Sequence, residues 1–182
     1  HGVLNTETAE EVWELCNKKL QDESMSARNL IRQSNVNLIC TTDDPVDDLH
    51  WHEMIKEDES FQVQVLPAWR PDKAMNLEKT DYTEYLEKLE KASGMLIRSF
   101  RDLKEALKKR MLFFDKMRCR ASDHGLEYVM YVPETEENVE KIFAKRLSGK
   151  NVTREEELKF KTAFMQFAAE EYSRLGWVMQ LH

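Results

Sequence analysis

The sequence predicts an α/β fold, namely part of a (β/α)8 barrel with about four parallel strands and a large helical insertion, helix-rich overall. Three observations support this class. Short apolar segments alternate with helical stretches, which favours βα units and parallel pairing. Each of these segments ends in ionisable residues, and the chain stops on the last segment without a helix behind it. The strands therefore amount to about half a barrel, and one sheet edge is left to be covered.

The composition is that of a globular protein with its own core. The chain has 182 residues, 41% of them hydrophobic, and no apolar run approaches the roughly 20 residues that span a membrane. No signal peptide is visible. The formal net charge of −7 argues against nucleic acid as a partner. Cys16, Cys40 and Cys119 are widely spaced, which is typical of free thiols in a reducing compartment, so we expect a cytoplasmic protein.

Two helices are predicted before the first strand. The first covers 6–23, where Thr6 or Thr8 can act as N-cap and an apolar face repeats at helical spacing. The second is short and covers 26–33. Both belong to the helical part of the chain and carry no candidate site residue.

The first strand is predicted over 36–40, and it leads to Asp43 and Asp44. A proline follows Asp44, and an aspartate N-cap before a proline favours a helix start, so a helix is predicted from this point with His50 and His52 near its beginning. We expect both aspartates to be structural, one as the helix cap and the other paired with a lysine or arginine. The two histidines are interpreted as surface or rim residues.

The second strand is predicted over 61–69, because apolar residues alternate there with glutamines. Pro71 stops the strand, since it has no N–H to donate. Arg70 is left at the carboxyl end between Trp69 and Pro71, where its planar guanidinium could clamp a ligand carboxylate at two points. The alternative is that Arg70 pairs with Asp72 or a neighbouring acid.

Later elements follow from caps and periodicity. A helix begins at Thr80 or Asp81 and ends at Gly94, and a longer one begins at Ser99. An extended segment, 118–122, leads to Asp123 and His124. Three further elements complete the prediction: a helix over about 136–147, a helix from the Thr153–Glu156 capping box to Gly176, and a strand over 177–182.

The chain is therefore predicted to be one piece, residues 1–182, in which barrel-type segments alternate with helical elaboration. The barrel-type segments cover about 34–72, 118–126 and 176–182, and the helical parts cover about 1–33, 73–117 and 134–175. The strands end in Asp43 and Asp44, in Arg70, in Asp123 and His124, and in His182. Because active sites of parallel α/β folds lie at the carboxyl ends of the strands, we expect the functional site there.

Four motifs carry a resemblance to a known family. They are TTDDPVDDLHWH at 41–52, VLPAWRPDKAMN at 65–76, RASDHGL at 120–126 and RLGWVMQLH at 174–182. Together with the opening TAEEVWELCNKKL, they resemble the uronate (glucuronate) isomerases of the amidohydrolase superfamily. That family has a distorted (β/α)8 barrel with extra helices. It interconverts D-glucuronate with D-fructuronate, and D-galacturonate with D-tagaturonate, by proton transfer between C1 and C2 through an enediol.

The resemblance implies roles for individual residues. Arg70, flanked by Trp69, would bind the carboxylate of a hexuronate. Asp123 would hydrogen-bond the substrate or orient a neighbour, and His124 would lie beside it. His182 falls where superfamily members place a histidine at the metal centre or beside the substrate. The predicted catalytic residues are therefore His182 and Asp123, and the predicted substrate-binding residues are Arg70, Trp69 and His124.

The resemblance also shows what this chain lacks. The family holds its divalent metal, expected to be zinc, mainly with a His-x-His pair on the first strand and an aspartate on the last, and no residue here matches either. The pair His50 and His52 follows a helix start, where side chains two residues apart point about 200° apart and cannot chelate one ion. Apart from His182, the ligands would lie outside this chain. We therefore expect a piece of a larger enzyme that is inactive alone and self-associates through its open sheet edge.

Two other functions remain open at this point. One is a metal-dependent hydrolase of the same superfamily, in which a metal-bound water attacks an ester or amide. The other is a helical interaction module without catalysis, which would not account for ionisable residues at four successive strand ends.

Overall fold

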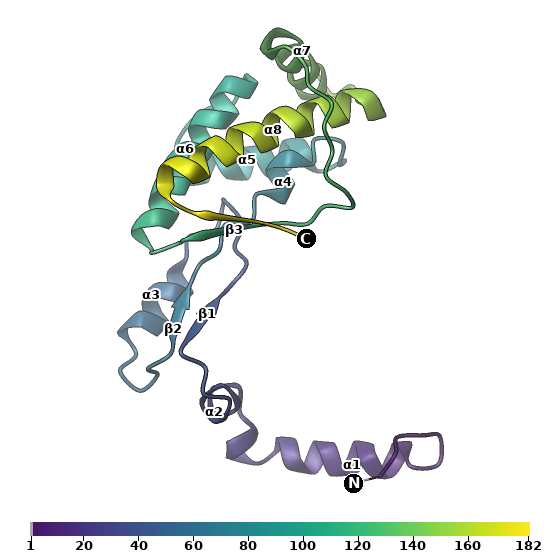
Figure 1. Ribbon diagram of the computed structural model, residues 1–182, viewed down its shortest axis with the longest axis vertical. Helices are drawn as coiled ribbons and strands as arrows, with labels where there is room; N and C mark the ends of the chain where they lie inside the picture. The colour runs from purple at the N-terminus through teal and green to yellow at the C-terminus, as the bar shows by residue number, and fades with distance from the viewer. Residues whose placement is uncertain (1) are drawn as a thin grey trace. The chain divides into compact units, whose positions relative to one another are not determined.

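The computed structural model describes residues 2–182, and the chain folds into two compact units (Figure 1). One unit contains the residues up to Ile39 together with Ile55–Val65, and the other contains Cys40–Met54 and Leu66–His182. The larger unit holds every candidate site residue named above. Sequence patterns alone had indicated a single piece.

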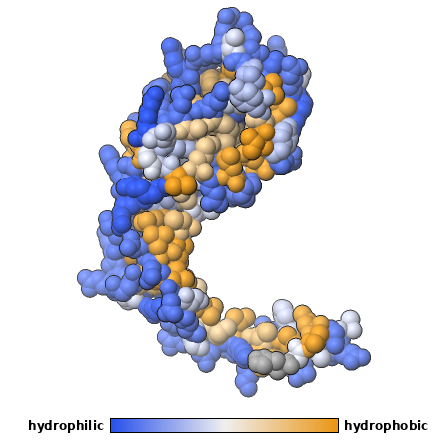
Figure 2. Space-filling view, viewed as in Figure 1, coloured by the Kyte–Doolittle hydropathy of each residue, from blue (hydrophilic) through white to orange (hydrophobic). Residues whose placement is uncertain are grey.

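The smaller unit begins with three short helical elements: α1 (Ala9–Leu20), the 3-10 helix η1 (Glu23–Met25) and α2 (Ala27–Gln33). The predicted single helix over 6–23 ends early, because the Asp22 carboxylate accepts a hydrogen bond from the Ser24 N–H at 2.8 Å and starts the 3-10 turn. Neither α1 nor α2 contains a buried residue, so the apolar face of α1 lies at the surface, where Figure 2 shows orange atoms.

The strands are short and run parallel. They are β1 (Leu38–Cys40), β2 (Gln64–Leu66), β3 (Ala121–His124) and β4 (Val178–Leu181). β1 and β2 form one two-stranded sheet, and β3 pairs with β4 in parallel, with Ser122 opposite Met179. Trp69 links the ends of the two sheets, because it forms parallel bridges to both Asp43 and Ser122. The predicted parallel order of four strand ends is therefore present, although β2 is shorter than the predicted 61–69.

The larger unit is rich in helices, as predicted. Its helices are α4 (Asp72–Met75), α5 (Tyr82–Ser93), α6 (Phe100–Lys116), α7 (Glu136–Leu147) and α8 (Arg154–Leu175), and it also contains the first part of α3 (His50–Glu57). The caps read from the sequence are confirmed: Ser99 caps α6, and Thr153 and Glu156 form a capping box on α8. Gly94 and Gly176 end α5 and α8 with φ of 67° and 69°, a left-handed conformation that glycine adopts without strain.

The predicted helix start at Asp44 is wrong. Asp44 forms a side-chain turn instead, because its carboxylate accepts a hydrogen bond from the Val46 N–H at 3.1 Å. Leu49 then has a φ of 58°, which breaks any helix, and α3 begins only at His50. The buried Arg110 holds this turn by donating to the carbonyls of Pro45 and Asp47, both at 2.7 Å.

The core of the larger unit is aromatic. Phe143 stacks on Phe160 with their ring planes 12° apart, and Phe100 packs against both. The apolar residues that repeat at helical spacing on α6 and α8 are buried in it: Phe100, Met111, Phe114, Phe164 and Phe167. This core joins α6, α7 and α8 into the body on which β3 and β4 lie.

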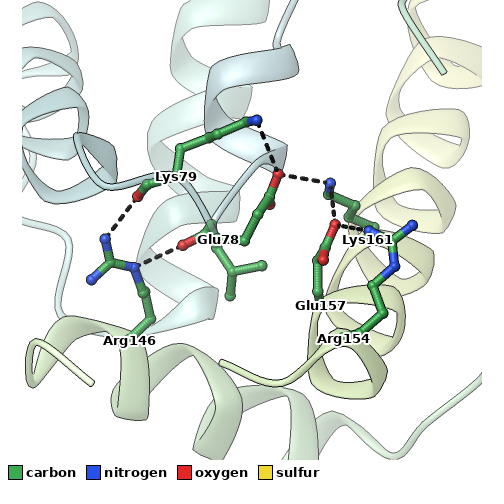
Figure 3. Close-up of polar contacts among 7 residues, drawn as sticks. Glu78, Lys79, Arg146, Arg154, Glu157 and Lys161 are labelled. Carbon is green, nitrogen blue, oxygen red and sulfur yellow. Dashed lines mark hydrogen bonds and ion pairs between the residues drawn. The ribbon is translucent and has the colours of Figure 1, made fainter. Parts of the chain in front are cut away.

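Charged side chains are also buried inside this unit (Figure 3). Lys161 on α8 is only 8% exposed, and its ammonium lies 2.7 Å from a Glu157 carboxylate oxygen and 3.2 Å from Glu78. Arg146 on α7 donates to the carbonyls of Leu77 and Lys79 at 2.7 and 2.8 Å. These contacts hold α7 and α8 against the segment between α4 and α5. In the chain, α4 comes shortly after Arg70.

Candidate substrate-binding site at the carboxyl ends of the strands

Arg70 lies where the chain leaves the strand series. Its backbone N–H donates to the Asp43 carbonyl at 2.8 Å, which extends the parallel pairing by one residue. Its guanidinium Nε donates to Asp72 Oδ2 at 3.1 Å, and Nη1 lies 3.6 Å from Asp123 Oδ2. The side chain is 37% exposed. The pairing with Asp72 anticipated as the alternative is therefore present, and part of the side chain remains exposed.

Asp123 and His182 continue the site from β3 to the end of β4. The Asp123 N–H donates to the Trp69 carbonyl at 2.8 Å, and the His182 N–H donates to the His124 carbonyl at 3.0 Å, so both backbones are fixed. Asp123 Oδ1 lies 2.7 Å from His182 Nδ1, a close contact without the alignment of a hydrogen bond. The structure thus brings Arg70, Asp123 and His182 together. A carboxylate beside an imidazole is an arrangement that can orient the imidazole and move a proton.

Two predicted substrate-binding residues have buried side chains. Trp69 is fully buried, with its ring edge-on to Phe114 at 4.9 Å between centroids. His124 is fully buried as well, and its ring lies 5.7 Å from that of Tyr172. Along a strand alternate residues face opposite sides, so Trp69 and His124 point to the core while their neighbours Arg70 and Asp123 point to the site. In this structure they support the site from behind.

The buried imidazole of His124 is held neutral. Desolvation lowers its pKa below the usual 6.5, the charge of Arg70 acts in the same direction, and the carboxylates of Asp72 and Asp123 oppose it. Its Nδ1 lies 3.8 Å from Asp72 Oδ1, too far for a hydrogen bond.

The stability of the larger unit is expected to fall as the pH drops below 6.5. The unfolded chain then binds a proton at His124 that the folded chain, with its lowered pKa, does not, so the free energy of unfolding decreases by up to about 1.4 kcal/mol per pH unit. The measurement is urea unfolding by circular dichroism at pH 7.5, 6.5 and 5.5. His124→Gln removes the titrating group and should flatten the slope. Equal slopes in both proteins would contradict the assignment.

Sequence reasoning missed several polar residues of the site. An open cavity of about 420 Å³ lies beside Arg70, and its wall includes Asp44, Asp72 and Lys73. Lys73 Nζ lies 3.3 Å from Asp44 Oδ2, so the aspartate that pairs with a lysine is the one expected to cap a helix, whereas Asp43 accepts a hydrogen bond from the Thr41 hydroxyl. The Tyr85 hydroxyl donates to Asp44 Oδ1 at 3.0 Å, and burial, then the Asp44 charge, raises the pKa of Tyr85 well above 10. Asp44 had a signal in its place at a strand end, and Asp72 and Lys73 had one in the motif VLPAWRPDKAMN.

The two histidines of α3 differ. His50 is exposed, as predicted for both, but His52 is buried. His52 Nε2 lies 2.7 Å from the hydroxyl of Thr41, which donates to Asp43 Oδ2 at 2.6 Å. Of the two positions expected for His52, surface or rim, the surface is therefore wrong, because the contact with Thr41 holds the imidazole beside the carboxyl end of β1.

The described residues, 2–182, do not form a metal site by themselves. In residues 2–182 no three histidine, cysteine, aspartate or glutamate side chains lie close enough together to hold a metal ion. His182 Nδ1, the most obvious donor, is turned toward Asp123. We therefore derive no chemical step through a metal from the residues present.

Fold and site together define a class: a helix-rich mixed α/β protein with short parallel strands, whose cationic and acidic side chains meet at the carboxyl ends of those strands. A family model described as glucuronate isomerase matches residues 1–182, and the chain belongs to that family. None of the helices in the described residues has the length and apolar character needed to cross a membrane.

Two curated relatives and two solved structures illustrate the similarity. Uronate isomerases from Lachnospira eligens and Lachnoclostridium phytofermentans are 63% and 61% identical to this chain over 182 residues, which is 100% of this chain and 39% of each relative. The crystal structure of uronate isomerase from Thermotoga maritima matches with a TM-score of 0.87 and 37% identity, over 100% of this chain and 40% of that one. Glucuronate isomerase from Caulobacter crescentus, at 24% identity, shows the same fold with a TM-score of 0.87, over 99% of this chain and 37% of that one. The chain thus spans about two fifths of the length of these relatives.

Proposed function

We propose that this chain forms the carboxylate-binding part of an aldose–ketose isomerase that acts on hexuronates. The reaction is the interconversion of D-glucuronate with D-fructuronate, and of D-galacturonate with D-tagaturonate, by proton transfer between C1 and C2. The observation that carries the proposal is the partly exposed Arg70 guanidinium beside Asp123 and His182, in a chain of the glucuronate isomerase family.

Each residue has a role that follows from its position. Arg70 presents two parallel N–H groups to the sugar-acid carboxylate, a geometry that an arginine provides and a lysine does not. His182, oriented by Asp123, hydrogen-bonds the sugar and is placed to hold or move a proton near the reacting carbons. Trp69 and His124 act behind these groups, as buried supports of Arg70 and Asp123.

The wider setting belongs to the same proposal. The parallel order of the strand ends supports an arc of a (β/α)8 barrel that residues beyond this segment would complete. A divalent metal ion, zinc, would be held mainly by such residues. We place the enzyme in the cytoplasm, and its small-molecule partner is a hexuronate. We expect the isolated segment to self-associate into a homo-oligomer.

Arg70→Lys in a full-length enzyme that contains this segment tests the proposal. We expect KM for D-glucuronate to rise about tenfold, because one charge-assisted hydrogen bond of about 1.5 kcal/mol is lost, while kcat changes little. The measurement is steady-state isomerisation to D-fructuronate. Lys141→Arg, on the surface of α7 where Lys141 pairs with Glu137, is the control outside the site and should leave KM unchanged.

Two further measurements test the proposed function. The 182-residue chain alone is expected to show no isomerase activity, and a lactone offered to the full-length enzyme is expected not to be hydrolysed. An unchanged KM in Arg70→Lys would refute the role of Arg70, and robust isomerisation by the isolated chain would refute its incompleteness.

A further inference from the structure

We propose that Asp72 is a positioning residue that sets the orientation of the Arg70 guanidinium toward the sugar acid. The inference rests on the proposed function and adds a residue to it. Asp72 Oδ2 accepts a hydrogen bond from Arg70 Nε at 3.1 Å and another from the Gly125 N–H, also at 3.1 Å. One carboxylate oxygen therefore fixes the arginine against the loop that follows β3.

Because Arg70 donates to Asp72 through Nε, this hydrogen bond does not occupy Nη1 or Nη2 of the guanidinium. In the described part of the chain, neither Nη1 nor Nη2 of Arg70 makes a hydrogen bond, and the nearest acid to Nη1 is Asp123 at 3.6 Å. The terminal edge of the guanidinium, with its two parallel N–H groups, is thereby left to face a ligand carboxylate. A flexible arginine would lose side-chain entropy on binding, and fixing it beforehand lowers that cost.

Gly125 makes the close approach possible. A Cβ atom at this position would lie 3.0 Å from Arg70 Nη2 and 3.2 Å from Asp72 Oδ2, both tighter than ordinary contacts. A side chain at residue 125 would therefore push the Arg70–Asp72 pair away from the loop by a few tenths of an ångström. Asp72 is itself held, because it is the first residue of α4 and follows Pro71, whose φ is restricted.

The environment of Oδ1, the second carboxylate oxygen of Asp72, indicates that the negative charge of Asp72 has a function. Among the described residues Oδ1 has no hydrogen-bond partner, and it is buried 3.8 Å from the neutral His124 imidazole. A buried, unpartnered carboxylate oxygen is costly, and an asparagine could accept the same two hydrogen bonds without the charge. An aspartate here is explained if its charge is needed to hold the charged Arg70 in one orientation.

The test is a double-mutant cycle in a full-length enzyme that contains this segment, with Asp72→Asn, Arg70→Lys and the double variant. We expect Asp72→Asn to raise KM for D-glucuronate about tenfold, the factor that corresponds to loss of one charge-assisted contact, with kcat within about twofold. In the Arg70→Lys background, Asp72→Asn should change KM by no more than about twofold, because Asp72 acts through Arg70. Asp81→Asn, at an exposed helix start without a side-chain hydrogen bond, is the matched control.

A second variant guards against a folding defect. Gly125→Ala keeps the Asp72 charge and displaces Arg70 Nη2, so it should raise KM without lowering kcat. An unchanged KM in Asp72→Asn, or a full tenfold effect of Asp72→Asn in the Arg70→Lys background, would overturn the inference. The proposed function fails separately, if Arg70→Lys alone leaves KM unchanged. A raised KM in Arg70→Lys together with an unchanged KM in Asp72→Asn would remove only the role of Asp72.

Discussion

Replacing Lys161 by methionine is expected to lower the free energy of unfolding of the larger unit by about 3 kcal/mol or more. Methionine fills a similar volume, so the loss comes from the charge. Lys161 is 8% exposed and lies between Glu157 and Glu78, and Glu157 is itself only 5% exposed. Without the ammonium, a carboxylate remains buried with only Arg154 as its partner.

Two comparisons isolate the cause in urea unfolding. Lys141→Met, on the surface of α7 where Lys141 pairs with Glu137, should cost no more than about 0.5 kcal/mol. The double variant Lys161→Met with Glu157→Leu should recover much of the loss, because no uncompensated charge is then buried. A cost for Lys161→Met equal to that for Lys141→Met would contradict this account.

The effect of Lys161→Met should also depend on pH. In the wild-type chain burial opposes ionisation of Glu157, but hydrogen bonds from Lys161 and Arg154 outweigh it, and the net pKa is lowered. Glu157 therefore contributes stability above its unfolded pKa of about 4.3, and this contribution is lost as the pH falls through the lower folded value. The difference between wild type and Lys161→Met should accordingly shrink as the pH falls below about 4.3 and through the lower folded value.

Local signals in the sequence located most helices of the larger unit, because their ends are determined by nearby residues. The Ser99 cap, the capping box at Thr153 and the left-handed Gly94 and Gly176 act over a few residues, and each is where the pattern placed it. Asp44 shows the limit of this reasoning. Its local pattern favours a helix cap equally well, but the donation from Arg110, distant in sequence, stabilises a turn instead.

The site was predictable to the extent that parallel strands bring their carboxyl ends together. This rule, with the motifs, identified Arg70, Asp123 and His182 as neighbours. It did not say which of two adjacent residues faces the core, and the side chains of Trp69 and His124, which were expected to bind substrate, are buried in this structure. The facing depends on register, which Trp69 sets through its bridges to Asp43 and Ser122.

Trp69→Ala is expected to lower the free energy of unfolding by about 3–5 kcal/mol. The ring is fully buried against Phe114 and Trp177, so truncation leaves a cavity in the layer beneath the strand ends. Trp51→Ala, at a tryptophan that is 69% exposed on α3, should change stability by less than about 0.5 kcal/mol in the same urea titration. Equal costs for the two substitutions would show that Trp69 is not part of the core.

Trp69→Phe separates support from substrate contact. Phenylalanine can keep the edge-on packing with Phe114 and removes a buried indole N–H that has no hydrogen-bond partner, so its cost in stability should be well below that of alanine. Because the backbone of Trp69 still donates to Ala121 and accepts from Asp123, Arg70 keeps its place. KM for D-glucuronate in the full-length enzyme should then be unchanged. A raised KM with normal stability would instead mean that the indole touches the sugar acid, and that Trp69 binds substrate directly.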